Sequence, residues 1–314
     1  MNSAAPITAQ PAQHPTVVER SEKVLGVVLA GLSGVAISVQ SRINGELGVR
    51  LGDGVLAAVI SFGSGLVLLV LVVPLVPKAR TGVRRLVRAV RGRSIMFWQC
   101  LGGVGGATLV ATQGLTVGTL GVAVFVVAVV AGQTGSSLLV DKFGIGPGAR
   151  RPLTWPRMIG AALTLVAVAG AMSGRFDGRI ALWLIVLPLI AGCAIAVQQA
   201  VNGQVRAAAD SALTATLLNF VTGTTALVLA WLVTSRLALP DAFPTEPWLY
   251  LGGALGVVFI GIAAMVVRWT GVLLFGLATI AGQLVGAVVL DLVVPAEGAP
   301  LQQATLIGAA LTLV

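Results

Sequence analysis

Charged side chains are scarce in this 314-residue sequence, where Asp, Glu, Lys and Arg together make up 10% of the residues. A soluble domain averages about 25%. No stretch is long and polar enough to form a separate aqueous domain, which excludes a soluble enzyme carried on a membrane anchor. The two cysteines, Cys100 and Cys193, lie inside apolar runs, which excludes a disulfide scaffold.

Groups that carry catalysis or bind metals are equally sparse. The single histidine, His14, lies in a polar N-terminal tail. The sequence has no cluster of His, Asp and Glu, no nucleophile beside a base and no metal-ligand spacing. We therefore expect no enzymatic activity, no catalytic residue, and no cofactor or metal.

Hydrophobic residues, in contrast, make up 57% of the chain and gather in ten apolar runs. A helical run of about 20 residues crosses the ~30 Å hydrocarbon core of a bilayer. A helix also satisfies its own backbone hydrogen bonds there. The sequence thus predicts an all-α polytopic membrane protein with about ten transmembrane helices. The runs cover residues 24–43, 55–76, 95–117, 120–140, 157–173, 180–201, 211–234, 248–269, 271–294 and 304–314.

Both ends of the chain depart from this pattern. Residues 1–23 are polar and lack a helical period, which predicts a disordered cytoplasmic tail. The last run, 304–314, has only 11 residues and is too short to cross a membrane. We therefore expect the tenth helix to be truncated.

The segment 78–93 carries seven basic residues and no acidic one. Because Lys and Arg collect in cytoplasmic loops, this segment is predicted to face the cytoplasm, in a chain located in the cytoplasmic membrane. Alternation of the spans then places the N-terminus in the cytoplasm. We interpret the segment as a topology determinant that contacts anionic lipid of the bilayer, in preference to a nucleic-acid site. Its basic residues are Lys78, Arg80, Arg84, Arg85, Arg88, Arg91 and Arg93.

The two halves of the chain repeat one another. The matching segments are 34–65 with 192–223 (ten of 32 residues identical), 98–141 with 248–291 (fourteen of 44) and 159–166 with 307–314 (all eight). The predicted repeats, 24–174 and 175–314, hold five runs each. Because five is odd, the second repeat enters the membrane from the opposite side. This predicts two inverted five-helix repeats, typical of secondary transporters, with a substrate site near the midplane between them.

Amides at membrane depth are the first candidate substrate ligands, because polar groups there are costly and informative. Gln133 and Gln283 occupy aligned positions deep within the fourth and ninth runs. An amide can both donate and accept a hydrogen bond, so two of them around one cavity could orient a substrate. The alternative is that they link helices, at about 0.6 kcal/mol for each hydrogen bond.

Two polar stripes on the aligned first helices of the repeats are the second candidates. Gln40 and Asn44, four residues apart, share one helix face near the outer end of their run. Gln198 and Asn202 repeat this spacing near the inner end of theirs. The stripes predict symmetry-related gates on opposite sides, with helix capping or packing as the alternative. Asn219 in the seventh run could also line the cavity.

Two aligned carboxylates, Asp141 and Asp291, lie near the ends of the fourth and ninth runs. They could cap loops or carry a coupling proton, and we favour the cap. No Asp, Glu, Lys or His lies at the centre of a run. This argues against a strongly cationic substrate, which would favour a buried acid.

Four spaced motifs run through the first repeat. They are Gly34-x5-Gln40-x3-Asn44-Gly45, Phe62-x2-Gly65, Gly102-Gly103-x2-Gly106, and Ala131-Gly132-Gln133 with Asp141-Lys142-Phe143-Gly144. The pattern resembles the YdcZ-type branch of the drug/metabolite transporter superfamily, whose members are commonly five-span bacterial inner-membrane proteins. This chain looks like two of them fused. The resemblance implies a ten-helix inverted-repeat exporter or permease of small metabolites, and it implies no particular substrate.

The leading hypothesis is a bacterial inner-membrane secondary transporter that exports a small neutral or zwitterionic metabolite, or a drug-like compound, by alternating access. It predicts a water-accessible midplane cavity lined by Gln133 and Gln283. The alternative is a non-transporting membrane scaffold or assembly protein. That function predicts a tightly packed centre between the halves.

Overall fold

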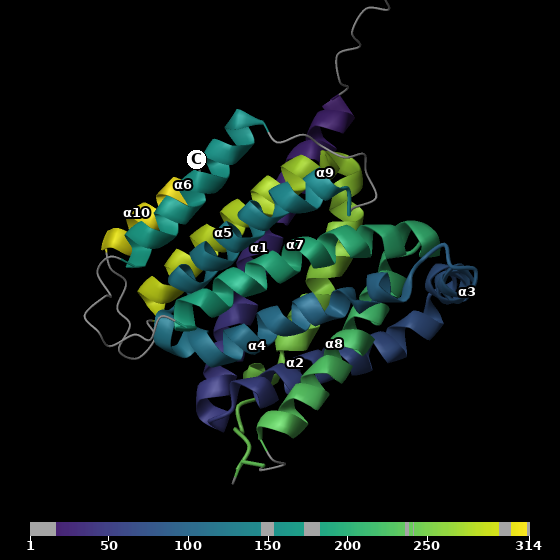
Figure 1. The fold of residues 1–314 in the computed structure, drawn as a ribbon, viewed down its shortest axis with the longest axis horizontal. Coiled ribbons are helices and arrows are strands. Elements are labelled where there is room, and N and C mark those ends of the chain that lie inside the picture. The colour runs from purple at the N-terminus through teal and green to yellow at the C-terminus, as the bar shows by residue number, and fades with distance from the viewer. Residues whose placement is uncertain are drawn as a thin grey trace, which may run out of the picture.

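The computed structural model of this chain is built from helices (Figure 1). It describes residues 17–145, 154–172, 183–235, 239–240, 242–294 and 303–312, and no strand occurs within these ranges. The all-α prediction is therefore confirmed for the described part. In chain order the helices are α1 (Val17–Leu51), α2 (Gly54–Val72), η1 (Val73–Leu75), α3 (Pro77–Arg91), η2 (Phe97–Gly102), α4 (Gly103–Leu120), α5 (Val122–Phe143), α6 (Trp155–Met172), α7 (Trp183–Ala209), α8 (Ala212–Thr234), η4 (Pro247–Tyr250), α9 (Gly252–Val293) and α10 (Gln303–Thr312).

Seven helical segments in the described residues are long and apolar enough to cross a membrane. They are Ser21–Leu51, Gly54–Leu75, Phe97–Leu120, Val122–Phe143, Trp183–Ala209, Ala212–Thr234 and Leu274–Val293. These segments correspond to the first four, the sixth, the seventh and the ninth of the apolar runs. The chain thus has the helices of a multi-pass membrane protein, and the total of ten spans stays a prediction.

Helices α1 and α9 are longer than the apolar runs that predicted them. Helix α1 begins at Val17, inside the predicted tail, and residues 1–16 lie outside the described part of the chain. Helix α9 joins two predicted runs, although its green and yellow parts take different directions in Figure 1. It continues as a helix through Gly271. At the aligned Gly121, by contrast, φ is +78°, and the helix is interrupted there between α4 and α5.

Helix α3 occupies the segment that the sequence predicted as a basic loop. Its Ala79, Gly82 and Leu86 recur at intervals of three and four residues, so they share one face, and all three are buried. They pack against α7 and α8. Figure 1 shows α3 end-on at the right, across the direction of α4 and α7. The helix therefore lies across one end of the bundle.

The first long helix of each repeat packs against the other repeat. Helix α1 contacts α9, α7 contacts α4 and α5, and α2 contacts α8. Two aligned glycines allow these crossings. A Cβ at Gly34 would lie 2.1 Å from the carbonyl oxygen of Thr279, and a Cβ at Gly192 would lie 2.1 Å from that of Val129. No side chain fits at either position, so the backbones touch directly, as is common between membrane helices.

Two aligned aromatic rings fill the interface between α2 and α8. Phe62 and Phe220 stack with their ring centroids 4.9 Å apart. Each ring also covers a glycine of the other repeat, Phe62 over Gly223 and Phe220 over Gly65. Both rings are buried within a larger apolar cluster. This part of the interface between the repeats is therefore packed with aromatic and aliphatic groups.

Candidate functional site

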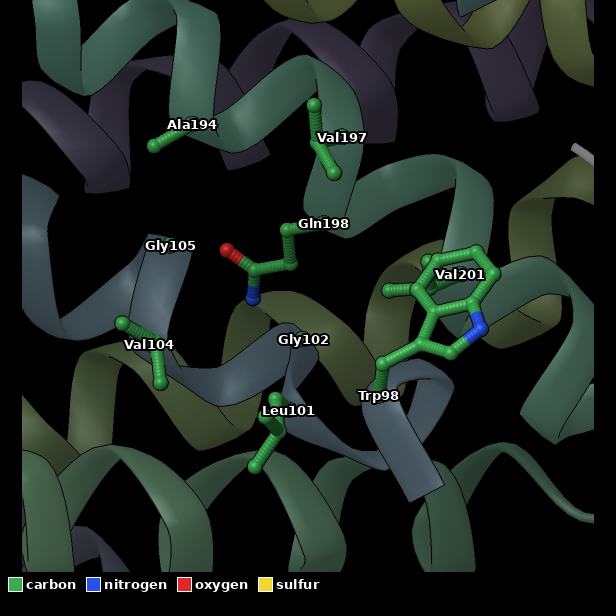
Figure 2. A pocket seen from close by; sticks show the side chains of 9 residues that line it. All are labelled: Trp98, Leu101, Gly102, Val104, Gly105, Ala194, Val197, Gln198 and Val201. Carbon is green, nitrogen blue, oxygen red and sulfur yellow. The ribbon is translucent and has the colours of Figure 1, made fainter. Parts of the chain in front are cut away.

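A pocket of about 320 Å³ opens between η2 and α4 of the first repeat and α7 of the second (Figure 2). Its walls are mostly aliphatic, with one indole and one amide, and none of the residues that line it is charged. The lining residues are Trp98, Leu101, Gly102, Val104, Gly105, Ala194, Val197, Gln198 and Val201. The pocket therefore suits an uncharged molecule with an apolar body.

Gln198 supplies the amide of this pocket. In Figure 2 its side chain extends from α7 toward the glycines of η2 and α4. A Cβ at Gly106 would lie 3.1 Å from the Gln198 Nε2, so the glycine leaves room for the amide. The Gln198 Oε1 is buried and has no hydrogen-bond partner among the described residues. A buried acceptor without a partner costs about 1–3 kcal/mol, and a ligand that donates a hydrogen bond would recover that energy.

Gln40, at the aligned position in the first repeat, is hydrogen-bonded to the opposite helix. Its Nε2 donates to the carbonyl oxygen of Gly252 at 2.8 Å. The facing glycine matches, because a Cβ at Gly256 would lie 3.1 Å from the Gln40 Nε2. The two aligned glutamines therefore face aligned glycines across the interface. One amide is bonded to the opposite helix, and the other lines an open pocket.

An ion pair accompanies the bonded glutamine. Arg50 at the end of α1 pairs with Glu246, just before η4 in the second repeat, and its Nε also donates to Glu46 at 2.9 Å. The pKa of Glu246 lies below its ordinary value because its own backbone N–H and the Arg50 guanidinium stabilise the carboxylate. The positions aligned with Arg50 and Glu246 hold Ala208 and Met96. The pair therefore has no counterpart at the open pocket.

The predicted asparagines lie over glycines of the opposite repeat. A Cβ at Gly102 would lie 2.5 Å from the Asn202 Oδ1 and 3.2 Å from the Asn219 Oδ1. At the aligned Gly252, a Cβ would lie 2.3 Å from the Asn44 Oδ1 and 2.8 Å from the hydroxyl aligned with Asn219, that of Ser61. The structure thus brings Gln198, Asn202 and Asn219 together at one site and their aligned residues together at the other.

Gln113 belongs to the second of these groups and was missed by sequence reasoning. Its Oε1 accepts a hydrogen bond from the Asn44 Nδ2 at 2.7 Å, and its Nε2 donates to the Ser41 hydroxyl at 2.9 Å. All three side chains are buried. The available signal was a glutamine within the third apolar run. It carried little weight because the aligned residue, Ala263, is not polar.

Gln133 and Gln283 lie at two different helix crossings. The Gln133 Nε2 donates to Gln199 at 3.3 Å, where α5 crosses α7. The backbone carbonyl of Gln283 accepts a hydrogen bond from the Ser38 hydroxyl at 2.7 Å, where α9 crosses α1. Both side chains are half-buried, and neither lines the pocket of Figure 2. Their predicted role around one shared cavity stays a prediction.

Asp291 reaches across the interface to the first turn of α5. Its Oδ1 accepts the N–H of Val122 at 2.9 Å and its Oδ2 accepts the N–H of Ala123 at 2.7 Å. The carboxylate is buried and lies beside Gly121, where the chain turns with positive φ. A carboxylate is stabilised at a helix N-terminus by the free N–H groups there. Asp141, the aligned residue, is half-buried near the end of α5.

The described residues hold no group of three or more His, Cys, Asp or Glu that could bind a metal ion. The chemistry of the site is therefore that of amides, one indole and aliphatic side chains. Such groups can bind and orient a solute, and they hold no nucleophile paired with a base.

Comparison with known proteins identifies the family. The model of the family described as "Putative inner membrane exporter, YdcZ" matches residues 25–170 and again residues 183–314. No curated protein matches the chain. One solved structure, described only as the crystal structure of a protein, is similar at 17% identity with a TM-score of 0.48, covering 94% of each chain. Because the family matches once in each half, the chain belongs to the YdcZ branch of the drug/metabolite transporters, a family of inner membrane exporters, as a double repeat.

Proposed function

We propose that this chain is a secondary exporter that moves a small uncharged solute along the interface between its repeats, which lie inverted in the inner membrane. The observation that carries the proposal is the unequal state of two aligned sites. Gln198 lines an open pocket, whereas Gln40 is bonded to Gly252. Equivalent sites in opposite states fit one end of an alternating-access cycle.

The lining of the open pocket narrows the substrate class. Aliphatic side chains and the Trp98 indole favour an apolar or aromatic body, and no charge offsets the desolvation of an ion. The free Oε1 of Gln198 favours an N–H or O–H group on the solute. Asn202 and Asn219 lie beside the same glycine and can contact a polar edge. The proposed substrate is therefore neutral and carries a hydrogen-bond donor.

The return half of the cycle exchanges the two states. Gln198 would donate to the carbonyl of Gly102, which aligns with Gly252, and Gln40 would be released to line a pocket of its own. The stacked rings of Phe62 and Phe220 lie between the two glutamine sites, because each ring contacts the glycine that faces one of them. In this proposal the rings are the barrier that keeps the pathway closed between the sites.

Four further residues complete the proposed machinery. Gln133 and Gln283 are a second pair of amides that orient the solute when the helix crossings move. Asp291 and Asp141 are the candidate coupling carboxylates. Protonation of Asp291 would weaken its two hydrogen bonds to the first turn of α5. A proton could in this way loosen the contact between α5 and α9.

A second function, that of a non-transporting scaffold or assembly protein, is favoured by one observation. The Phe62–Phe220 cluster is tightly packed between the repeats, as expected for a chain that never opens there. The open pocket beside Gln198 favours the exporter. A flux measurement distinguishes the two functions.

The test begins with a toxicity screen of overexpressing cells against uncharged aromatic amides and phenols, with cationic and anionic analogues matched in size. Each compound that responds is measured as flux in proteoliposomes. We expect flux of uncharged members, and a loss of about tenfold in Gln198→Leu and in Gln40→Leu, because one hydrogen bond is worth roughly 1.4 kcal/mol.

The matched control is Thr225→Val, which removes an exposed hydroxyl outside the pocket lining that donates to the carbonyl of Val221 within its own helix. Its flux should stay within twofold of the unsubstituted protein. Equal losses in Gln198→Leu and Thr225→Val would refute the amide site. A complete absence of flux across the panel would favour the scaffold.

A further inference from the structure

The cations of α3 divide into two groups that face different ways. Arg80, Arg84, Arg88 and Arg91 follow one another at intervals of four, four and three residues, which places them on one helix face. All four are exposed, and the buried Leu86 lies on the opposite side of the helix. We call these four residues the arginine stripe. No acidic residue lies on α3 to neutralise it.

The other two cations of α3 bind within the protein. Arg85 donates to Asp210 at 2.8 Å, and the Lys78 Nζ lies 3.5 Å from the same carboxylate. The Arg85 hydrogen bond and the Lys78 charge hold the pKa of Asp210 below its ordinary value. The stripe arginines, in contrast, have no ion pair with any described residue. Every residue of both groups carries one positive charge. Only the stripe arginines are left without an acidic partner among the described residues, so only they can bind an external anion.

The segments on either side of α3 fix its depth. Leu75, the last residue of η1 before α3, is 78% exposed, and Phe97, which follows α3, is 75% exposed. In a chain that crosses a bilayer, aromatic and aliphatic side chains exposed at the end of the bundle lie at the interface with lipid. Because α3 runs across that end of the bundle (Figure 1), the arginine stripe lies at the level of the headgroups.

We propose that the arginine stripe binds the phosphate groups of anionic phospholipids in the leaflet beside α3. The stripe supplies four guanidinium groups with no acidic neighbour on the helix, and each can donate two hydrogen bonds to one phosphate. Each basic residue near an anionic surface contributes enough to raise lipid affinity about fivefold. A soluble polyanion would see the same charges, but the lipid-facing residues at both ends of α3 place the stripe beside the bilayer.

The experiment uses the purified full-length protein in a neutral detergent. Fluorescent phosphatidylglycerol is titrated by anisotropy, with fluorescent phosphatidylcholine as the neutral lipid, and both titrations are repeated with inorganic phosphate and with heparin as competitors. Two double variants are compared, Arg84→Gln with Arg88→Gln in the stripe and Lys78→Gln with Arg85→Gln at Asp210. Both remove two positive charges from the same helix, so they change the net charge equally.

We expect the unsubstituted protein to prefer phosphatidylglycerol, and the stripe variant to lose about 25-fold in affinity. The Lys78/Arg85 variant should stay within about threefold. A third variant, Arg84→Lys with Arg88→Lys, keeps the charge and should keep most of the binding, which excludes misfolding as the cause. Equal losses in the two charge-removing variants would overturn the proposal. So would the lack of a phosphatidylglycerol preference, or displacement of the lipid by millimolar phosphate or by stoichiometric heparin.

Discussion

Replacing Gly132 with alanine tests the crossing of α5 and α7 on which the proposed movement depends. A Cβ there would lie 2.1 Å from the carbonyl oxygen of Leu189 and 2.9 Å from its carbonyl carbon. Both are backbone atoms that cannot rotate away, so the helices would have to separate by about 1 Å. Overpacking costs about 1–3 kcal/mol, and backbone contact places this site at the upper end. Better helix propensity returns about 1 kcal/mol, which leaves a net loss of about 2 kcal/mol.

Gly135, three residues further along α5, is the matched control. A Cβ at Gly135 would meet nothing within 4 Å, so Gly135→Ala should be neutral or stabilise the protein by up to about 1 kcal/mol. Both variants are unfolded in mixed micelles with increasing dodecyl sulfate and followed by circular dichroism. The free energies of unfolding should differ by about 3 kcal/mol between them. Coincident unfolding curves would show that α5 and α7 are not in backbone contact at Gly132.

Three further outcomes are expected. Asp291→Asn, followed by thermal unfolding in detergent, should lose about 2 kcal/mol because the amide NH₂ cannot accept the second N–H bond; an unchanged midpoint would contradict the cap. Alanine substitution of Phe62 and Phe220, alone and together, should give a coupling energy of about 1 kcal/mol in a double-mutant cycle, and strict additivity would contradict the stack. Glu246→Gln should lower the unfolding temperature at neutral pH, because a carboxylate with a lowered pKa stabilises the fold above its ordinary pKa. That difference should disappear as the pH falls through the lowered pKa, and a difference that persists in acid would rule out the ion pair with Arg50.

The sequence predicted the helices well because a hydrophobic run of membrane length has few other folds. The repeat aligned Gln40 with Gln198 and Asn44 with Asn202, and in the structure the aligned residues lie beside aligned glycines, while their role as substrate ligands stays a prediction. The sequence did not predict α3, because seven cations in one segment hid the apolar spacing of Ala79 and Leu86. The number of charged residues in a segment does not distinguish a loop from an amphipathic helix.

The state of each site could not be predicted from the residues that form it. Gln40 and Gln198 face the aligned glycines Gly256 and Gly106, yet one amide is bonded to Gly252 and the other lines a pocket. That difference depends on how the helices are placed and also on residue type, since Gly105 of the pocket aligns with the much larger Leu255. The sequence predicted how deep Gln133 lies in its apolar run. It did not predict the hydrogen bond to Gln199, because that contact depends on the angle at which α5 crosses α7.

The Asn44–Gln113 hydrogen bond has a consequence for how such a protein could evolve. The residue aligned with Gln113 is Ala263, so one half of the chain has this bond available and the other half does not. In a protein assembled from two identical copies either copy could form this bond, so neither of the two equivalent states would be preferred. If the chain follows the proposed cycle, joining the copies in one gene lets a single point mutation favour one of its two states.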